Sequence, residues 1–162
     1  MRLVLLILFT SLSAGTLHSQ VYDSVSFAKV RVNGIALGSK KEELVKKFGE
    51  PHKTVTTESN RGVDVYSDYY YQKSALRINT AGIFNGFKLT DNNFVLQYRK
   101  YLIRAGDSMK EFAIYFPQSF HAYTKNASGK FKLRIMPGNT FIVFKTRDGV
   151  IGEIETKEEE LY

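Results

Sequence analysis

The apolar residues of this chain repeat with two different periods, and each change of period separates a helical segment from an extended one. Spacings of three and four residues follow Gly38 and again Gly106, and they predict two short amphipathic helices. The apolar stripes consist of Leu44, Val45 and Phe48 in the first helix and of Met109, Phe112, Ala113 and Phe116 in the second. Each helix would span about three turns, which is marginal for an isolated helix in water. Both helices must therefore lie on an apolar surface.

Polar residues mark the start of both predicted helices. Ser39 to Glu42 and Ser108 to Glu111 each read Ser-x-x-Glu, the capping box, which satisfies two free backbone N–H groups of the first helical turn. Gly49 and Pro51 should end the first helix, and Pro117 should end the second.

After each helix the period changes to two, the pattern of β-strands with one buried face. The strands expected in the first half are Val63 to Tyr71, Ser74 to Thr80, Phe84 to Thr90 and Phe94 to Tyr98; those in the second are Lys130 to Met136, Thr140 to Thr146 and Val150 to Thr156. Pro137-Gly138-Asn139 and Asp148-Gly149 mark hairpin turns. Asn85-Gly86 and Thr80-Ala81-Gly82 lie too close together for both to be turns, which makes one of them a candidate bulge.

The two helix-and-strand segments match each other at an offset of 68 residues. The matching pairs are Ile35 and Ile103, Gly38 and Gly106, Glu43 and Glu111, Leu44 and Phe112, and Phe48 and Phe116. We therefore predict an α+β fold of two tandem repeats, each a short helical segment packed on an antiparallel β-meander. The first unit would span residues 20–101 and the second residues 102–162, which carries an acidic C-terminal end.

Residues 1–19 have the layout of a secretory signal peptide. Arg2 precedes the apolar run Leu3 to Phe9, and small and polar residues follow; cleavage after Gly15 and cleavage after Ser19 both fit the pattern. The apolar run is shorter than the roughly 20 residues that cross a bilayer, so we expect no membrane span and a periplasmic or secreted protein. The chain has no cysteine, so stability outside the cell must come from the core alone.

Charge is unevenly distributed along the chain. Without Arg2 the net charge is +6, and the segment from Glu153 onward carries −4, so residues 20–152 carry about +10. A basic exported domain can bind an acidic protein surface, anionic lipid headgroups or acidic glycans. Alternatively, the basic residues serve only to keep the protein soluble. Export makes nucleic acid an unsuitable partner, and the hydrophobic content of 43% excludes a disordered chain.

Two strand segments carry the candidate binding residues. In one strand, three basic residues alternate with three apolar ones and so occupy the face opposite the core. In another, three consecutive tyrosines place aromatic side chains on both faces, so one or more tyrosines should face away from the helix unless the second unit covers them. The candidate partner-binding residues are Tyr66 and Tyr70 as aromatic anchors and Lys130, Lys132 and Arg134 as the charged complement that meets the same partner.

The residue types that carry most catalysis are scarce in this chain. His52 and His121 are nearly equivalent in the repeat, which indicates a helix-exit position rather than a site. Asp64 and Asp68 would lie roughly 13 Å apart on one strand, too far for a close acid and base pair. No cysteine nucleophile, metal-ligand set or Gly-rich phosphate loop is present. We therefore predict a protein that is not an enzyme and needs neither metal nor cofactor; an envelope enzyme would require a pocket that gathers a histidine with a carboxylate.

Two segments resemble a known family. The segment from Ile35 to Pro51 (IALGSKKEELVKKFGEP) resembles the signature helix of the small periplasmic domains typified by the outer-membrane assembly lipoprotein small protein A. The tandem arrangement and the ending from Phe141 to Ile151 (FIVFKTRDGVI) resemble the β-lactamase inhibitor protein family, which is built from two such units. The resemblance covers the chain from about Ile35 to Ile154 and implies two α/β units whose sheets form a concave surface that binds other proteins and catalyses nothing.

The chain also departs from this family. Phe116-Pro117 stands where the first copy has Phe48-Gly49, and neither a lipidated cysteine nor a disulfide pair is present. No contact residue of the inhibitor can be transferred, so inhibition of a β-lactamase is a minor alternative. The sequence predicts an exported, monomeric or weakly associating interaction module whose partner is an acidic protein. Binding of a polyanion or glycan without a protein partner is the competing hypothesis.

Overall fold

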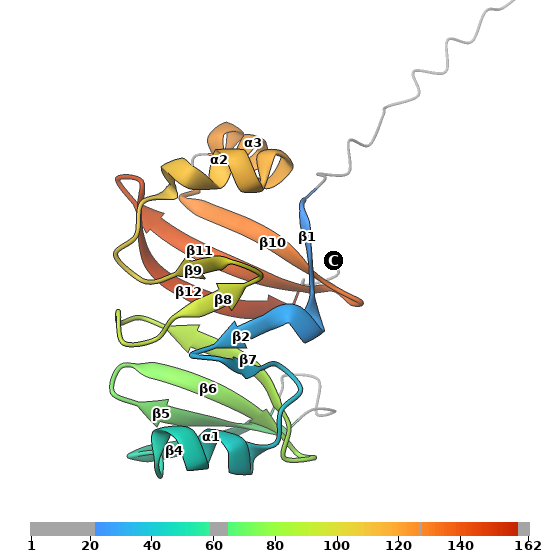
Figure 1. Cartoon of the computed structure of the whole chain (residues 1–162), viewed down its shortest axis with the longest axis vertical. Helices are drawn as coiled ribbons and strands as arrows, with labels where there is room; N and C mark the ends of the chain where they lie inside the picture. The colour runs from blue at the N-terminus through green and yellow to red at the C-terminus, as the bar shows by residue number, and fades with distance from the viewer. Residues whose placement is uncertain (1–21, 59–64, 127, 159–162) are drawn as a thin grey trace, which may run out of the picture.

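The computed structural model describes residues 22–58, 65–126 and 128–158. Within these ranges the chain forms a mixed eight-stranded sheet, an antiparallel four-stranded sheet and three short α-helices (Figure 1). The α+β class predicted from the sequence is therefore confirmed. The predicted signal peptide, residues 1–19, lies outside the described residues, in which no helix is long and apolar enough to cross a membrane.

The large sheet contains most of the strands. In order across the sheet they are β1 (Ser24–Ser26), β10 (Lys130–Met136), β11 (Thr140–Arg147), β12 (Val150–Glu158), β7 (Phe84–Leu89), β6 (Ser74–Asn79), β5 (Val65–Tyr71) and β4 (Lys53–Glu58). β1 runs parallel to its neighbour β10, and the other neighbouring pairs are antiparallel. The pairing of β12 with β7 joins the two halves of the chain edge to edge into one sheet.

The small sheet is made of two hairpins that pair with each other. Its order is β3 (Ile35–Ala36), β2 (Val30–Val32), β8 (Leu96–Tyr98) and β9 (Tyr101–Ile103). The helices are α1 (Lys41–Phe48), α2 (Phe112–Tyr115) and α3 (Pro117–Lys125), with 3-10 turns η1 (Phe27–Lys29) and η2 (Met109–Glu111). The small sheet and the helices lie on one face of the large sheet, here called the inner face, and the opposite face is the outer face (Figure 1).

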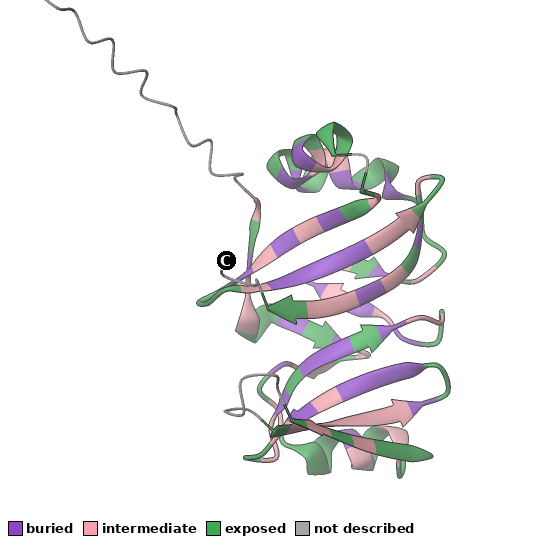
Figure 2. Ribbon diagram, turned by 180° about the vertical axis from the view of Figure 1, so that it is seen from behind, coloured by how far each residue is buried: buried purple, intermediate pink, exposed green. Residues whose placement is uncertain are grey.

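One core fills the space on the inner face. Leu44 of α1, Phe112 of α2 and Phe131 of β10 all belong to it, together with residues of the small sheet. Figure 2 shows buried positions on the strands of the large sheet, interrupted by half-buried and exposed ones. Phe131 is fully buried, and its ring packs edge-on against Phe112 and Phe144 with centroid distances of 5.2 and 5.4 Å. Both short helices are thus stabilised by apolar burial on the sheet, as their length requires.

The seven strands predicted from alternation are all present, and the turns agree as well. Asp148 and Gly149 both have positive φ, 53° and 75°, as a tight hairpin turn requires. Of the two candidate turns in the first half, Thr80-Ala81-Gly82 forms the turn between β6 and β7. Asn85 is the bulged residue, because Arg77 pairs with Gly86 and the next residue of β6 pairs with Phe84.

The helix boundaries required corrections. Lys40, not Ser39, is the N-cap of α1, and it makes no side-chain capping bond. Ser108 does cap η2, but it accepts from the Lys110 N–H at 3.3 Å. The second helical segment ends at Tyr115, just before Pro117, as predicted. Pro117 also begins a further helix that was not predicted, α3, where the missing proline N–H costs nothing.

Backbone contacts replace the expected capping boxes, and they are the same in both halves. In the first, Gly38 N donates to Phe84 O (2.7 Å), Lys41 N to Gly82 O (2.9 Å) and Phe84 N to Ser39 O (2.8 Å); in the second, Gly106 N donates to Ile151 O (2.7 Å), Met109 N to Gly149 O (2.9 Å) and Ile151 N to Asp107 O (2.9 Å). Gly38 and Gly106 have φ of 92° and 100°, a conformation that favours glycine. Each helical segment is therefore tied to the hairpin of its own half.

The N-terminal end of the described chain is tied to α3. The Ser119 N–H donates to Asp23 Oδ2 at 2.8 Å, and the Asp23 N–H donates to Ser119 Oγ at 2.9 Å. Asp23 thus supplies the side-chain acceptor that the first turn of α3 needs, from a position 96 residues away in the chain. The sequence near α3 offers Pro117 as a start signal but no side-chain cap, because the capping residue Asp23 is so distant in the chain.

Candidate partner-binding surface

The outer face of the large sheet carries a continuous row of residues that links the two predicted halves of the site. Cα partners across neighbouring strands share one face of a sheet. The row consists of Lys132, Val143, Glu155, Lys88, Ala75, Tyr70 and Lys53, one residue from each strand from β10 to β4. Lys132 and Tyr70, which sequence analysis assigned to different units, therefore face the same side of a single sheet.

The five candidate residues occupy this face but do not form one cluster. Tyr66 and Tyr70 lie on β5, and Lys130, Lys132 and Arg134 lie on β10. Five strand spacings of about 4.8 Å place the two groups roughly 24 Å apart across the sheet. The basic residues of β10 are therefore too far from the two tyrosines to contact them directly.

Each tyrosine instead has a cationic neighbour of its own. The Arg77 guanidinium lies 3.9 Å from the ring centroid of Tyr66, and the Lys53 ammonium lies 5.5 Å from that of Tyr70. Arg77 also donates to both carboxylate oxygens of Asp68, at 3.0 and 3.3 Å. Burial alone would lower the pKa of Arg77, but the hydrogen bond and the charge of Asp68 raise it above its usual value. Arg77 is thus held over the Tyr66 ring as a permanent cation.

The β10 end of the surface is built around a buried aromatic ring. Phe141 is only 3% exposed although it lies on the outer face. Tyr22 packs edge-on against its ring at 5.4 Å between centroids, and the Lys132 ammonium and the Arg134 guanidinium lie 5.7 and 5.3 Å from it. Lys132 and Arg134 are half-buried as a result, while Lys130 is exposed.

A network of ion pairs occupies the middle of the outer face. Glu153 pairs with Lys145 and with Lys88, the latter at 3.1 Å, and Lys145 also pairs with Glu155 at 3.0 Å. Burial opposes ionisation of Glu153, but the hydrogen bonds and charges of Lys145 and Lys88 lower its pKa overall. The hydrogen bond from Lys145 to Glu153 correspondingly raises the pKa of Lys145. The network crosses the junction of β12 and β7 and so stabilises the joined sheet.

These shifts predict how stability depends on pH. The pKa of Glu153 is lower in the folded chain than in the unfolded chain, so its contribution is present above the ordinary glutamate pKa and is lost as pH falls through the folded value. Glu153→Gln should therefore remove about 0.2–1 kcal/mol near pH 7 and flatten the loss of stability toward pH 3. Urea unfolding between pH 3 and 7 measures both effects. A variant profile parallel to that of the wild-type protein would contradict this role of Glu153.

The outer-face residues named above, together with Lys157, carry an excess of positive charge. Eight are basic: Lys53, Arg77, Lys88, Lys130, Lys132, Arg134, Lys145 and Lys157. Three are acidic: Asp68, Glu153 and Glu155. Glu153 and Glu155 lie on β12 near the middle of the sheet, and Asp68 lies on β5, where Arg77 binds it. The excess of basic residues suits a partner that carries negative charge.

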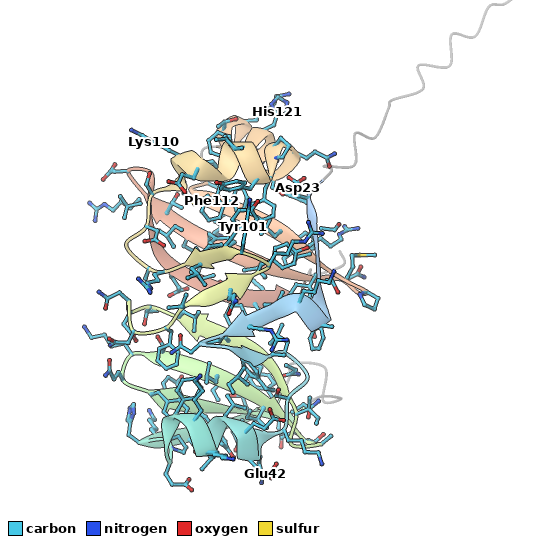
Figure 3. The ribbon with its side chains drawn as sticks, viewed as in Figure 1. Asp23, Glu42, Tyr101, Lys110, Phe112 and His121 are labelled. Carbon is cyan, nitrogen blue, oxygen red and sulfur yellow. The ribbon has the colours of Figure 1, made fainter. Side chains whose placement is uncertain are left out.

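The histidines are not gathered into a pocket with a carboxylate in either of two cavities. One cavity of about 480 Å³ lies beside β9, and another of about 510 Å³ lies beside α1; neither His52 nor His121 lines them. His121 lies on α3, at the end of the molecule far from α1 (Figure 3). Within the described ranges, no group of three or more histidine or acidic side chains could hold a metal ion. That the protein is not an enzyme and needs no cofactor stays a prediction. Asp64, one of the two carboxylates considered from the sequence, lies outside the described residues.

Sequence reasoning missed several residues of the surface. Arg77 could have been found as the one charged residue in the apolar strand Ser74–Asn79. Phe141 and Tyr22 carry no local signal, because their contact depends on which strand lies beside β10. Asp68, which sequence analysis considered only together with Asp64, is bound to Arg77.

Comparisons with protein-family models, with curated proteins and with solved structures find no match to this chain.

Proposed function

We propose that this protein is an exported, non-enzymatic interaction module of the bacterial cell envelope that binds an acidic protein partner through the outer face of the large sheet. The observation that carries the proposal is the row from Lys132 to Lys53, which places both predicted groups of residues on the face opposite the core. The signal-peptide pattern of residues 1–19 supports export to the periplasm or beyond.

The side chains of this face are held in place by contacts with one another, which supports a binding role for the face. Arg77 and Tyr66 hold each other in place, and Lys132 and Arg134 pack on Phe141, so their order is established before any partner arrives. Groups that are already ordered lose less conformational entropy on binding. The basic ends of the surface would also speed the encounter with an acidic partner.

A duplicated origin is part of the same proposal. The matching hydrogen bonds of Gly38 and Gly106 support two tandem units of the kind found in the β-lactamase inhibitor protein family, with an offset of 68 residues between the glycines and 67 between Phe84 and Ile151. The units would bind as one body, because β7 and β12 join them into one sheet. The protein would act as a monomer.

Binding of a polyanion or acidic glycan is the second candidate function, favoured by the basic excess on the outer face. Attraction to a polyanion depends on long-range charge and weakens steeply with salt. Retention on immobilised heparin that collapses between low and moderate salt, with no protein captured from an envelope extract, would support this candidate over a protein partner.

The test of the main proposal is crosslinked capture of a partner from native envelope extract, followed by measurement of its affinity. Tyr70→Ala combined with Lys132→Glu should weaken that affinity by about 10- to 100-fold, since anchor residues contribute most of the binding energy. Lys47→Glu, which changes the same charge on the exposed side of α1, is the matched control and should bind like the wild-type protein. Circular dichroism must show that both variants fold.

Two results would contradict the proposal. Equal affinity of the double variant and the control would show that the outer face does not bind the partner. Unfolding of the double variant would show instead that Tyr70 and Lys132 serve stability, and the single variant Lys130→Glu, at an exposed position, would then carry the test.

A further inference from the structure

A groove runs between strand β9 and the helical segment η2–α2, away from the outer face. Its volume is about 480 Å³, and its lining includes Tyr101, Leu102, Asp107, Glu111, Phe112 and Tyr115. Tyr101 and Phe112, which both line the groove, are labelled in Figure 3. Neither the proposed surface nor the predicted repeat accounts for this groove.

Strand β9 offers free hydrogen-bonding groups to the groove. It is the last strand at one edge of the small sheet. Tyr98 pairs with Tyr101, and the loop between them contains only Arg99 and Lys100. In such a two-residue hairpin, the residues that flank the loop exchange two backbone hydrogen bonds, each N–H donating to the other residue's C=O. The next residue, Leu102, therefore directs its N–H and C=O away from β8 and toward the free edge. An extended peptide could pair with them.

Apolar side chains are exposed on β9 and on α2, the two elements that flank the groove. Leu102 is 59% exposed, Ile114 is 77% exposed and Tyr115 is 39% exposed, and they account for half of the six large apolar residues exposed in the described ranges. The rings of Tyr101 and Tyr115 stack across the groove with centroids 4.2 Å apart. A group of exposed apolar residues beside a free strand edge is typical of a place where another chain packs.

The two ends of the groove carry opposite charges. Lys100 stands just before β9, and its ammonium lies 5.7 Å from the Tyr101 ring centroid. Asp107 and Glu111 line the groove beyond the other end of the strand. A strand antiparallel to β9 would start beside the two carboxylates and end beside Lys100. Charge complementarity then requires a basic residue at its N-terminal end and an acidic residue at its C-terminal end.

We infer that the groove binds an extended segment of a partner protein, paired antiparallel to β9, with a basic first residue, apolar alternate residues and an acidic last residue. The backbone of Leu102 supplies the hydrogen bonds and the rings of Tyr101 and Tyr115 supply the apolar surface, as in other cases where a peptide extends a sheet. This site is independent of the outer face and of the function proposed for it.

Three synthetic peptides with blocked ends test the inference by NMR titration of the full protein. Lys-Val-Thr-Val-Asp should shift the amide signals of Leu102 and Tyr115. The reversed peptide Asp-Val-Thr-Val-Lys has the same composition and should bind about tenfold more weakly. Lys-Val-Pro-Val-Asp should not bind, because proline lacks the central N–H that the pairing needs.

A pair of variants at matching positions tests the role of charge. Glu111→Lys should weaken binding of the first peptide about tenfold and abolish its advantage over the reversed peptide. Glu43→Lys makes the same change at the equivalent exposed position of α1 and should leave binding unchanged. Both substitutions are on exposed residues, so both variants should fold.

Several results would overturn the inference. Equal binding of the two charged peptides, shifts located on β5 or β10 in place of β9, or no shift at the solubility limit of the peptides would each do so. Binding to phosphatidylglycerol vesicles that is lost in Ile114→Asp, without any response to the peptides, would identify a lipid surface instead.

Discussion

Phe131→Ala is expected to lower the free energy of unfolding by about 3–5 kcal/mol, the largest effect of any single change considered for this chain. Phe131 is fully buried on the inner face of β10, where its ring lies within 6.3 Å of the centroids of Phe112, Phe116, Tyr123 and Phe144. Truncation removes these contacts and leaves a cavity that four aromatic rings on different elements cannot close together.

Urea unfolding followed by circular dichroism measures this effect. Phe131→Leu keeps most of the volume and should cost less than the alanine variant. Ile114→Ala is the matched control at a position 77% exposed, and it should change the free energy of unfolding by no more than about 0.5 kcal/mol. A loss below about 1.5 kcal/mol in Phe131→Ala would mean that the core is not organised around this ring.

Gly86→Val is expected to cost about 2–4 kcal/mol, because it disturbs the junction at which the two halves of the large sheet meet. A Cβ atom at Gly86 would lie 2.6 Å from Thr156 Oγ1, closer than real Cβ contacts. That hydroxyl accepts from the Phe87 N–H at 2.9 Å and so extends the junction beyond the two Cα pairs of β12 and β7. The valine would displace Thr156 and break this bond.

The chain offers a close control for this prediction. Gly152 lies in β12, the same strand as Thr156. A Cβ atom at Gly152 would lie 3.8 Å from its nearest neighbour, the backbone oxygen of Lys145, which is an ordinary contact. Gly152→Val should therefore be nearly neutral in the same unfolding experiment. Gly86→Val combined with Thr156→Ala removes the atom that clashes and should recover part of the stability. Equal effects of the two glycine variants would exclude a steric cause at the junction.

The local elements predicted from the sequence are those whose signals lie within a few residues. The alternation in Lys130–Met136 predicted the bounds of β10 correctly, because Phe131, Leu133 and Ile135 all face the core. The turn at Asp148-Gly149 was equally well defined, because its two positive φ angles restrict which residues fit. Short strands such as β2 and β3 were missed, since two or three residues are too few to show a period. β4 was missed because Val55 is its one apolar residue.

The candidate site was predicted residue by residue but not as an arrangement. Tyr70 and Lys132 were assigned to separate units, and only the pairing of β7 with β12 places them in one row. Alternation shows which side of a strand a residue faces, but the order of strands depends on contacts between segments far apart in the chain. The observed cationic neighbours of Tyr66 and Tyr70, which are Arg77 on β6 and Lys53 on β4, could not be predicted for the same reason.

The sequence by itself determined the α+β class, the main strands, most turns and the presence of basic and aromatic residues on strand faces, because these follow from local periodicity and backbone preferences. Only the tertiary structure decided that the halves share one eight-stranded sheet, that Asp23 caps α3, and that β9 ends at an open groove. Those features depend on distant segments that meet only in the folded chain, where burial of a common core selects one arrangement among many.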